Sequence, residues 1–141
     1  MNIEQKLNEY KENIETLAEI DSLEVYQWLM SLGEKLSNDP LSKERHLQGN
    51  KVTKCQYDMY VDIEEGRFKA WSKAMIAGGY AYVLLDIFNS LDEQERKKIT
   101  VEHFQKIKLD ELLTLNRQTG FYQMIEIMLR KVHASLSLIH I

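Results

Sequence analysis

Cys55 is the residue whose side chain is best suited to chemistry, and it is the single cysteine of the chain. A deprotonated thiol is a strong nucleophile, whereas a free cysteine in a core acts as a small apolar side chain. Position alone leaves both roles open. Lys51 and Lys54 are close in the sequence, and positive charge near a thiol favours the thiolate. These neighbours predict a reactive thiol.

With one cysteine, the chain offers neither an internal disulfide nor a redox site built from two cysteines. A cysteine hydrolase would need a histidine that folding brings to the thiol, and His46 and His103 are the candidates. The histidines are scattered, without a close pair of ligands, so we expect no metal site. They are His46, His103, His133 and His140.

The bulk properties of the 141 residues predict a single domain, 1–141. Hydrophobic residues make up 44% and charged residues 28%, as in ordinary soluble proteins. The net charge is −4 and there is no basic run, so nucleic acid is not an expected partner. No apolar stretch approaches the ~20 residues that span a membrane. The polar N-terminal residues do not resemble a signal peptide, and a lone thiol favours the cytoplasm, where thiols stay reduced.

The elements that precede the cysteine follow from the spacing of apolar residues. Spacings of three and four predict amphipathic helices over residues 3–17 and 21–36. Asp21 is the expected cap of the second helix, with Glu24 three residues later. The polar segment 37–50 contains the one proline and predicts a surface loop.

The pattern changes after the cysteine. Apolar and polar residues alternate over 57–64, which predicts a half-buried strand that begins directly after the cysteine. Residues 65–66, Glu-Gly, predict a turn into a return strand over 68–71. Two strands alone are marginal in water. The predicted fold class is therefore α+β, a small antiparallel sheet covered by helices.

The C-terminal half predicts further helices. Residues 75–91 read as a buried helix, in which the glycines at 78–79 would let another backbone come close. Residues 90–93 have the form of a capping box for a short charged helix, and 100–113 predict one or two short helices. Asn116 is the expected cap of the last helix. The core stripe of that helix would be Phe121, Ile125, Met128, Leu129 and Val132. The apolar end, residues 135–141, either frays or packs.

Four blocks of the sequence, in order, resemble the SufE family. Residues 50–56, Asn-Lys-Val-Thr-Lys-Cys-Gln, resemble the family's active-site loop. Residues 113–120 resemble the segment before its last helix, which ends in Ser/Asn-Arg-x-x-Gly. Residues 72–79 resemble its Ser-x-Ala-x-Ile-x-x-Gly block, and 26–36 its tyrosine helix with a Leu-Gly-x-x-Leu ending. The resemblance covers about residues 20–134.

The resemblance implies a SufE-like fold, related to the fold of the iron–sulfur scaffold IscU. It implies a carrier whose catalytic residue, Cys55, takes persulfide sulfur from a SufS- or CsdA-like cysteine desulfurase and stimulates that enzyme. Arg117, Gln56 and Lys54 are the implied partner-binding residues. The chain itself would need no cofactor, because the pyridoxal phosphate belongs to the desulfurase. The sulfur would pass to a downstream acceptor or cluster scaffold.

Near the cysteine the sequence differs from the family's pattern. Lys54 replaces the usual glycine before the cysteine, and Tyr57 replaces the usual serine two residues after it. These differences keep an alternative open, in which the protein docks on a desulfurase and modulates it without accepting sulfur.

Overall fold

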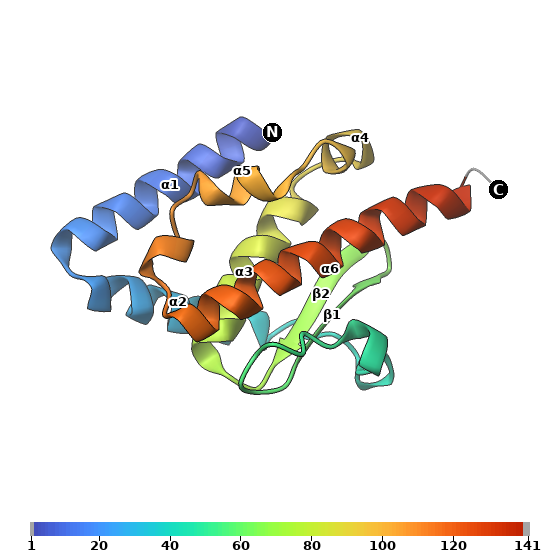
Figure 1. Ribbon diagram of the computed structural model, residues 1–141, viewed down its shortest axis with the longest axis horizontal. Helices are drawn as coiled ribbons and strands as arrows, with labels where there is room; N and C mark the ends of the chain where they lie inside the picture. The colour runs from blue at the N-terminus through green and yellow to red at the C-terminus, as the bar shows by residue number, and fades with distance from the viewer. Residues whose placement is uncertain (1, 140–141) are drawn as a thin grey trace.

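The computed structural model describes residues 2–139, with side chains through residue 134. The chain opens with two helices, α1 (Ile3–Ile20) and α2 (Ser22–Leu36), that pack on each other. Figure 1 shows α3 (Met75–Asn89) in the middle of the molecule, with α1 toward one side and the strands toward the other. The helices at 3–17 and 21–36 are confirmed. Asp21 caps α2 as predicted, since its side chain accepts the backbone N–H of Leu23.

Within the described residues the strands form a two-stranded antiparallel sheet of β1 (Met59–Glu64) and β2 (Arg67–Ser72). In the turn Glu65 and Gly66 both have positive φ, 55° and 79°, which matches the tight turns that suit twisted hairpins. Helix α3 packs on β2, and α6 (Leu115–Ile139) packs on β1. The predicted α+β class is thereby confirmed, while the relation to the IscU-type fold stays a prediction.

The first strand starts later than predicted. β1 begins at Met59, not at residue 57, and Tyr57 is 52% exposed. Residues 53–57 form turns and bends instead of an extended strand. The alternation of apolar residues was misleading there because the chain bends to bring Cys55 against α3, to which the Cys55 sulfur is hydrogen-bonded through Tyr80.

Helices α2 and α3 approach each other backbone to backbone. A Cβ atom on Gly79 would collide with the backbone carbonyl of Leu29, and one on Gly33 with the backbone carbonyl of Met75. The close approach predicted for the Gly78–Gly79 pair is confirmed at Gly79. At Gly78 a Cβ would meet its nearest neighbour at 3.4 Å, an ordinary contact.

Two predicted helix caps are wrong. Ser90 ends α3 rather than starting the next helix, and α4 (Glu93–Lys97) is capped by Asp92, whose carboxylate accepts the N–H of Glu95 at 2.8 Å. Asn116 lies inside the first turn of α6, which begins one residue earlier. Local sequence allowed either start in both cases.

The remaining helical predictions are confirmed. Residues 100–113 form α5 (Val101–Gln105) and a short 3₁₀ turn, η3 (Asp110–Leu112). The core stripe of α6 is buried, with Leu129 partly so. Helix α6 continues to Ile139, and the last residues of the predicted tail, 140–141, lie outside the described part.

The segment 37–50 is more ordered than a surface loop. It contains two 3₁₀ turns, η1 (Lys43–Arg45) and η2 (Gln48–Asn50), and it buries Leu41 and Asn50. Asp62 of β1 holds it by accepting hydrogen bonds from Arg45 at 2.9 Å and from Asn50 at 3.2 Å. The polar composition was compatible with a loop, but these side chains are bonded to the sheet.

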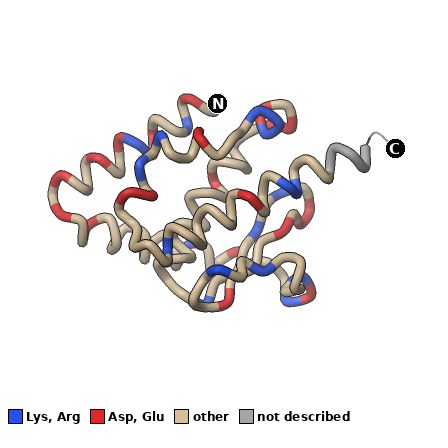
Figure 2. The backbone as a smooth tube through the Cα atoms, in the orientation of Figure 1, with Lys and Arg blue, Asp and Glu red and all other residues tan. Residues whose placement is uncertain are grey.

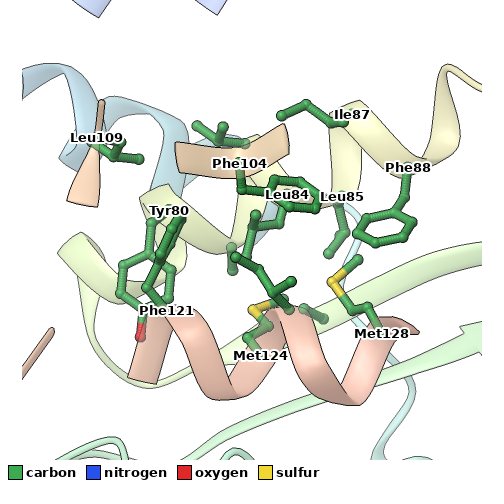
Figure 3. Close-up of a cluster of buried hydrophobic side chains, with 14 of the residues drawn as sticks. Tyr80, Leu84, Leu85, Ile87, Phe88, Phe104, Leu109, Phe121, Met124 and Met128 are labelled. Carbon is green, nitrogen blue, oxygen red and sulfur yellow. The ribbon is translucent and has the colours of Figure 1, made fainter. Parts of the chain in front are cut away.

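The core extends from α1 and α2 across α3 to the strands, α5 and α6. Figure 3 shows its aromatic and methionine side chains, which include Tyr80, Phe88, Phe104, Phe121, Met124 and Met128. In Figure 2, acidic residues, in red, recur along α1, and residues of both charges are spread over the rest of the chain. Between residues 2 and 139, each helix is too short or too polar to cross a membrane.

Replacement of Gly79 by alanine should destabilise the protein by about 1–3 kcal/mol, because a methyl group has no space against the α2 backbone. The matched control is Gly49→Ala in η2, where a Cβ would have nothing within 4 Å. Urea denaturation of both variants measures the difference. Equal unfolding free energies for the two would show that α2 and α3 can separate without cost.

Candidate functional site

Cys55 lies in a short closed loop, residues 53–58, called the cysteine loop below. The loop is closed at its base because the N–H of Val52 donates to the carbonyl of Met59 at 2.9 Å. Within it, the N–H of Cys55 donates to the carbonyl of Val52 at 3.3 Å. The thiol is thus presented by a turn anchored on the sheet, which restricts where the sulfur can lie.

Helix α6 holds the same loop through the amide of Gln123. Its oxygen accepts the N–H of Lys54 at 2.7 Å, and its nitrogen donates to the Thr53 hydroxyl at 2.8 Å. The sequence analysis did not identify Gln123. One signal was available, because Gln123 lies three residues after Gly120, and residues at that spacing share a helix face.

The sulfur of Cys55 sits between α3 and α6. Its Sγ atom lies 3.1 Å from the hydroxyl of Tyr80, within hydrogen-bonding distance. A Cβ atom on Gly120 would lie 2.6 Å from both the sulfur and the hydroxyl oxygen. Gly120 is the glycine of the Asn-Arg-x-x-Gly block, and these contacts explain why a residue without a side chain stands there. A larger residue would push the thiol and the phenol apart.

Burial raises the pKa of the Cys55 thiol, and the hydrogen bond from Tyr80 offsets part of that increase. The prediction that nearby lysines favour the thiolate is therefore wrong. Lys51 is paired with Asp58, at 3.3 Å between Nζ and Oδ1, and the side chain of Lys54 is exposed. Closeness in sequence overstated their effect, because charges in water are screened, whereas the thiol is partly withdrawn from water.

The thiol faces a cavity of about 420 Å³. Its walls come from α2, the cysteine loop, the N-terminal part of α3 with the residue before it, and the start of α6 with the residue before it. Among the lining residues, Arg117 is the one that carries a charge. The lining residues are Met30, Cys55, Gln56, Tyr57, Ala74, Met75, Ile76, Ala77, Tyr80, Thr114, Asn116 and Arg117.

Arg117 is half-buried at this cavity rather than free in solvent. Its guanidinium carbon lies 5.5 Å from the centre of the Tyr26 ring, a cation–π contact. Tyr26 in turn donates to the carbonyl of Leu112 at 2.6 Å. Of the predicted site residues, the structure brings Cys55, Gln56 and Arg117 to one cavity, and it leaves Lys54 beside the cavity on the exposed face of the loop.

The two candidate histidines are engaged elsewhere. The His46 ring stacks on Tyr60 with centroids 4.8 Å apart, and Nδ1 of His103 accepts the N–H of Thr100 at 2.9 Å. The thiol is bonded to a phenol, not to an imidazole. Among the described residues, no group of three or more metal-binding side chains comes together. The arrangement therefore supports thiol chemistry without a histidine base.

Known proteins resemble this chain in sequence and in fold. The model of the family described as "SufE: Fe-S metabolism associated domain" matches residues 11–132. The chain belongs to the SufE family. It is 29% identical over 113 residues to an uncharacterized SufE-like protein of Synechocystis sp., covering 77% of this chain and 70% of that protein. The predicted family is thereby confirmed.

The fold has also been seen in a solved structure. The solution structure of a hypothetical protein from Thermus thermophilus matches with a TM-score of 0.67, over 94% of this chain and 96% of that one. At 19% identity this likeness shows the shared fold alone. Membership of the SufE family associates the protein with iron–sulfur metabolism.

Replacement of Gln123 by alanine should loosen the cysteine loop, because the N–H of Lys54 loses its acceptor. A hydrogen bond of this kind is worth about 1 kcal/mol, so amide hydrogen exchange in the loop should quicken by roughly fivefold to tenfold. Gln27→Ala, at an exposed position of α2, is the matched control. Unchanged exchange at residues 53–55 in Gln123→Ala would contradict the clamp.

Proposed function

We propose that this SufE-family protein accepts a sulfur atom on Cys55 from the persulfide of a cysteine desulfurase. The observation that supports this most directly is the position of the thiol. It lies on the wall of a cavity of about 420 Å³ that is open to the outside. Such a space admits a side chain and a short piece of backbone from a partner, so that a persulfide can be brought to Sγ.

The transfer is a thiol–disulfide exchange. The Cys55 thiolate attacks the outer sulfur of the partner's persulfide, a new S–S bond forms on Cys55, and the partner's S–S bond breaks. The partner's cysteine leaves as a thiolate, and Cys55 becomes the persulfide. No external oxidant or reductant is required. The chain needs one thiol for this, and it has one.

The docking face would surround the mouth of the cavity. Arg117 lines the cavity and offers a planar guanidinium to a carboxylate of the partner. Gln56 and Lys54 are exposed on the cysteine loop and would contact the partner beside it. Tyr57 and Met75 add exposed apolar area at the same place. Apolar contacts next to one fixed cation are typical of specific protein interfaces.

In this proposal the pyridoxal phosphate stays in the desulfurase, and the chain contributes no cofactor of its own. The sulfur then passes to a downstream acceptor or cluster scaffold of iron–sulfur metabolism. We place the reaction in the cytoplasm, where a lone thiol remains reduced. Stimulation of the desulfurase follows from removal of the sulfur that blocks its cysteine.

The variant Cys55→Ser tests sulfur acceptance. The protein is mixed with a cysteine desulfurase and cysteine, and its intact mass is measured before and after reduction. The wild type should gain one sulfur atom that a reductant removes. The serine variant should keep its melting temperature and gain none, because serine is nearly isosteric and forms no persulfide. Labile sulfur on the serine variant would contradict the assignment to Cys55.

The raised pKa of Cys55 favours one alternative, a SufE-fold modulator that docks on a desulfurase without taking its sulfur. A neutral thiol attacks a persulfide poorly. The same experiment separates the two functions. Faster cysteine turnover without a mass increase on the wild type would support the modulator, whereas a mass increase supports the carrier.

Arg117→Ala should weaken docking more than stability. The cation–π contact with Tyr26 is worth about 0.5–1 kcal/mol at a partly exposed site, so the melting temperature should fall little. Desulfurase stimulation at low protein concentration should drop about tenfold, because a charge-assisted contact with the partner is lost. Arg130→Ala, at an exposed position farther along α6, is the control. Equal stimulation by both variants would remove Arg117 from the docking face.

A further inference from the structure

We propose that Tyr80 is a further catalytic residue, whose hydroxyl donates the hydrogen bond that stabilises the sulfur anion of Cys55 during transfer. The inference rests on the proposed function, since it assigns a role within that reaction. It concerns the one described side chain whose hydrogen bond to Sγ is seen, at 3.1 Å.

The geometry gives the phenol little freedom to leave the sulfur. Tyr80 is 1% exposed, and its ring meets that of Phe121 edge to face, with centroids 5.6 Å apart. Figure 3 shows the two rings side by side at one end of the core cluster. On the other side, the absence of a Cβ at Gly120 lets the sulfur and the hydroxyl meet, since a Cβ there would lie 2.6 Å from each. The hydroxyl is therefore preorganised for one partner, the Cys55 sulfur.

The direction of the hydrogen bond follows from the protonation states. While the thiol is neutral, either group can donate. Once the sulfur has lost its proton it can only accept, so the phenol must donate. Burial, together with the neighbouring Cys55, holds the pKa of Tyr80 well above its usual range. The phenol therefore keeps its proton at neutral pH and remains a donor.

The thiol needs this donor because its surroundings disfavour charge. Burial raises the pKa of Cys55, and the contribution that lowers it is the hydrogen bond from Tyr80. Water would donate hydrogen bonds to an exposed thiolate. At Cys55 the hydroxyl of Tyr80, held in place by the core, donates instead. Donors already in place cost no reorganisation when charge develops, which is the usual advantage of a preorganised site.

Tyr80 moves no proton in the reaction. The Cys55 thiol first releases its proton to solvent through the open cavity. The thiolate then attacks the partner's outer sulfur, and the partner's cysteine leaves as a thiolate with the electron pair of the broken S–S bond. The phenol donates to Sγ before the attack and continues to donate to the inner sulfur of the product persulfide. Arg117 lines the same cavity, and its charge lowers the pKa of Tyr80 without offsetting the larger effect of burial.

The test uses Tyr80→Phe, which removes the hydroxyl and keeps the ring. The rate of iodoacetamide labelling of Cys55 is measured in the free protein as a function of pH. We expect labelling at pH 7 to slow by about tenfold, the loss of one hydrogen bond to a charged group. The midpoint of the pH profile should move up. Tyr10→Phe is the matched control, because it removes a buried hydroxyl that bonds to Asp86, on a different face of α3.

Labelling that is unchanged or faster in Tyr80→Phe would overturn the proposal, and faster labelling would show that Tyr80 restrains the loop instead. The second variant, Gly120→Ala, keeps both polar groups but forces them apart. It should slow labelling in the same direction, and it replaces Tyr80→Phe if that protein does not fold. Normal labelling in Gly120→Ala with an intact fold would also contradict the role of the bond.

Labelling does not involve a desulfurase, so it separates this inference from the proposed function. If the wild type takes up sulfur while Tyr80→Phe labels normally, the role of Tyr80 fails and the carrier function stands. If Tyr80→Phe labels slowly and also takes up sulfur more slowly at pH 7, with recovery at higher pH, both are supported. If the wild type takes up no sulfur, the proposed function is overturned and the catalytic role falls with it.

Discussion

Contact between the backbones of α2 and α3 is the constraint on which the site depends. With no side chain at Gly33 or Gly79, the carbonyl groups of one helix reach the other directly. This contact fixes the position of α3, and therefore of Tyr80, the residue that follows Gly79. It also brings Met30 of α2 to the wall of the same cavity. A wider spacing of the two helices would open the cavity and withdraw the phenol from the sulfur.

The second requirement is that α6 meets the cysteine loop from the opposite side. Gly120 leaves room for the sulfur, and Gln123, one turn later, bonds to the loop's backbone. One turn before Gly120, the same helix supplies Arg117 to the cavity. Farther along, its Lys131 donates hydrogen bonds to Asn50 and to Asp62 of β1. Helix α6 thus lines the cavity, leaves space for the thiol, and binds the segment that precedes the cysteine loop.

The chemistry of the thiol is a balance between desolvation and hydrogen bonding. Buried sulfur is harder to ionise, and a charged side chain in water does little to correct this. A buried hydroxyl at 3.1 Å acts over a short distance in a medium of low dielectric, where hydrogen bonds to an anion are strong. Burial therefore favours the neutral thiol in the resting protein. The hydrogen bond from Tyr80 stabilises the thiolate when it attacks.

The sequence by itself determined the elements and the family. Apolar residues located α1, α2, α3, α6 and the hairpin, because α3 is buried on most sides and the others bury one face. The blocks around Cys55 and Arg117 identified the SufE family. Tertiary structure decided where β1, α4 and α6 begin, because local sequence allowed more than one start for each. It alone brought Tyr80, Gly120 and Gln123 to the thiol and its loop, because contacts between residues far apart in the sequence depend on how helices pack. Tertiary structure also decided the pKa of Cys55, because burial raises it and burial is a property of the folded chain.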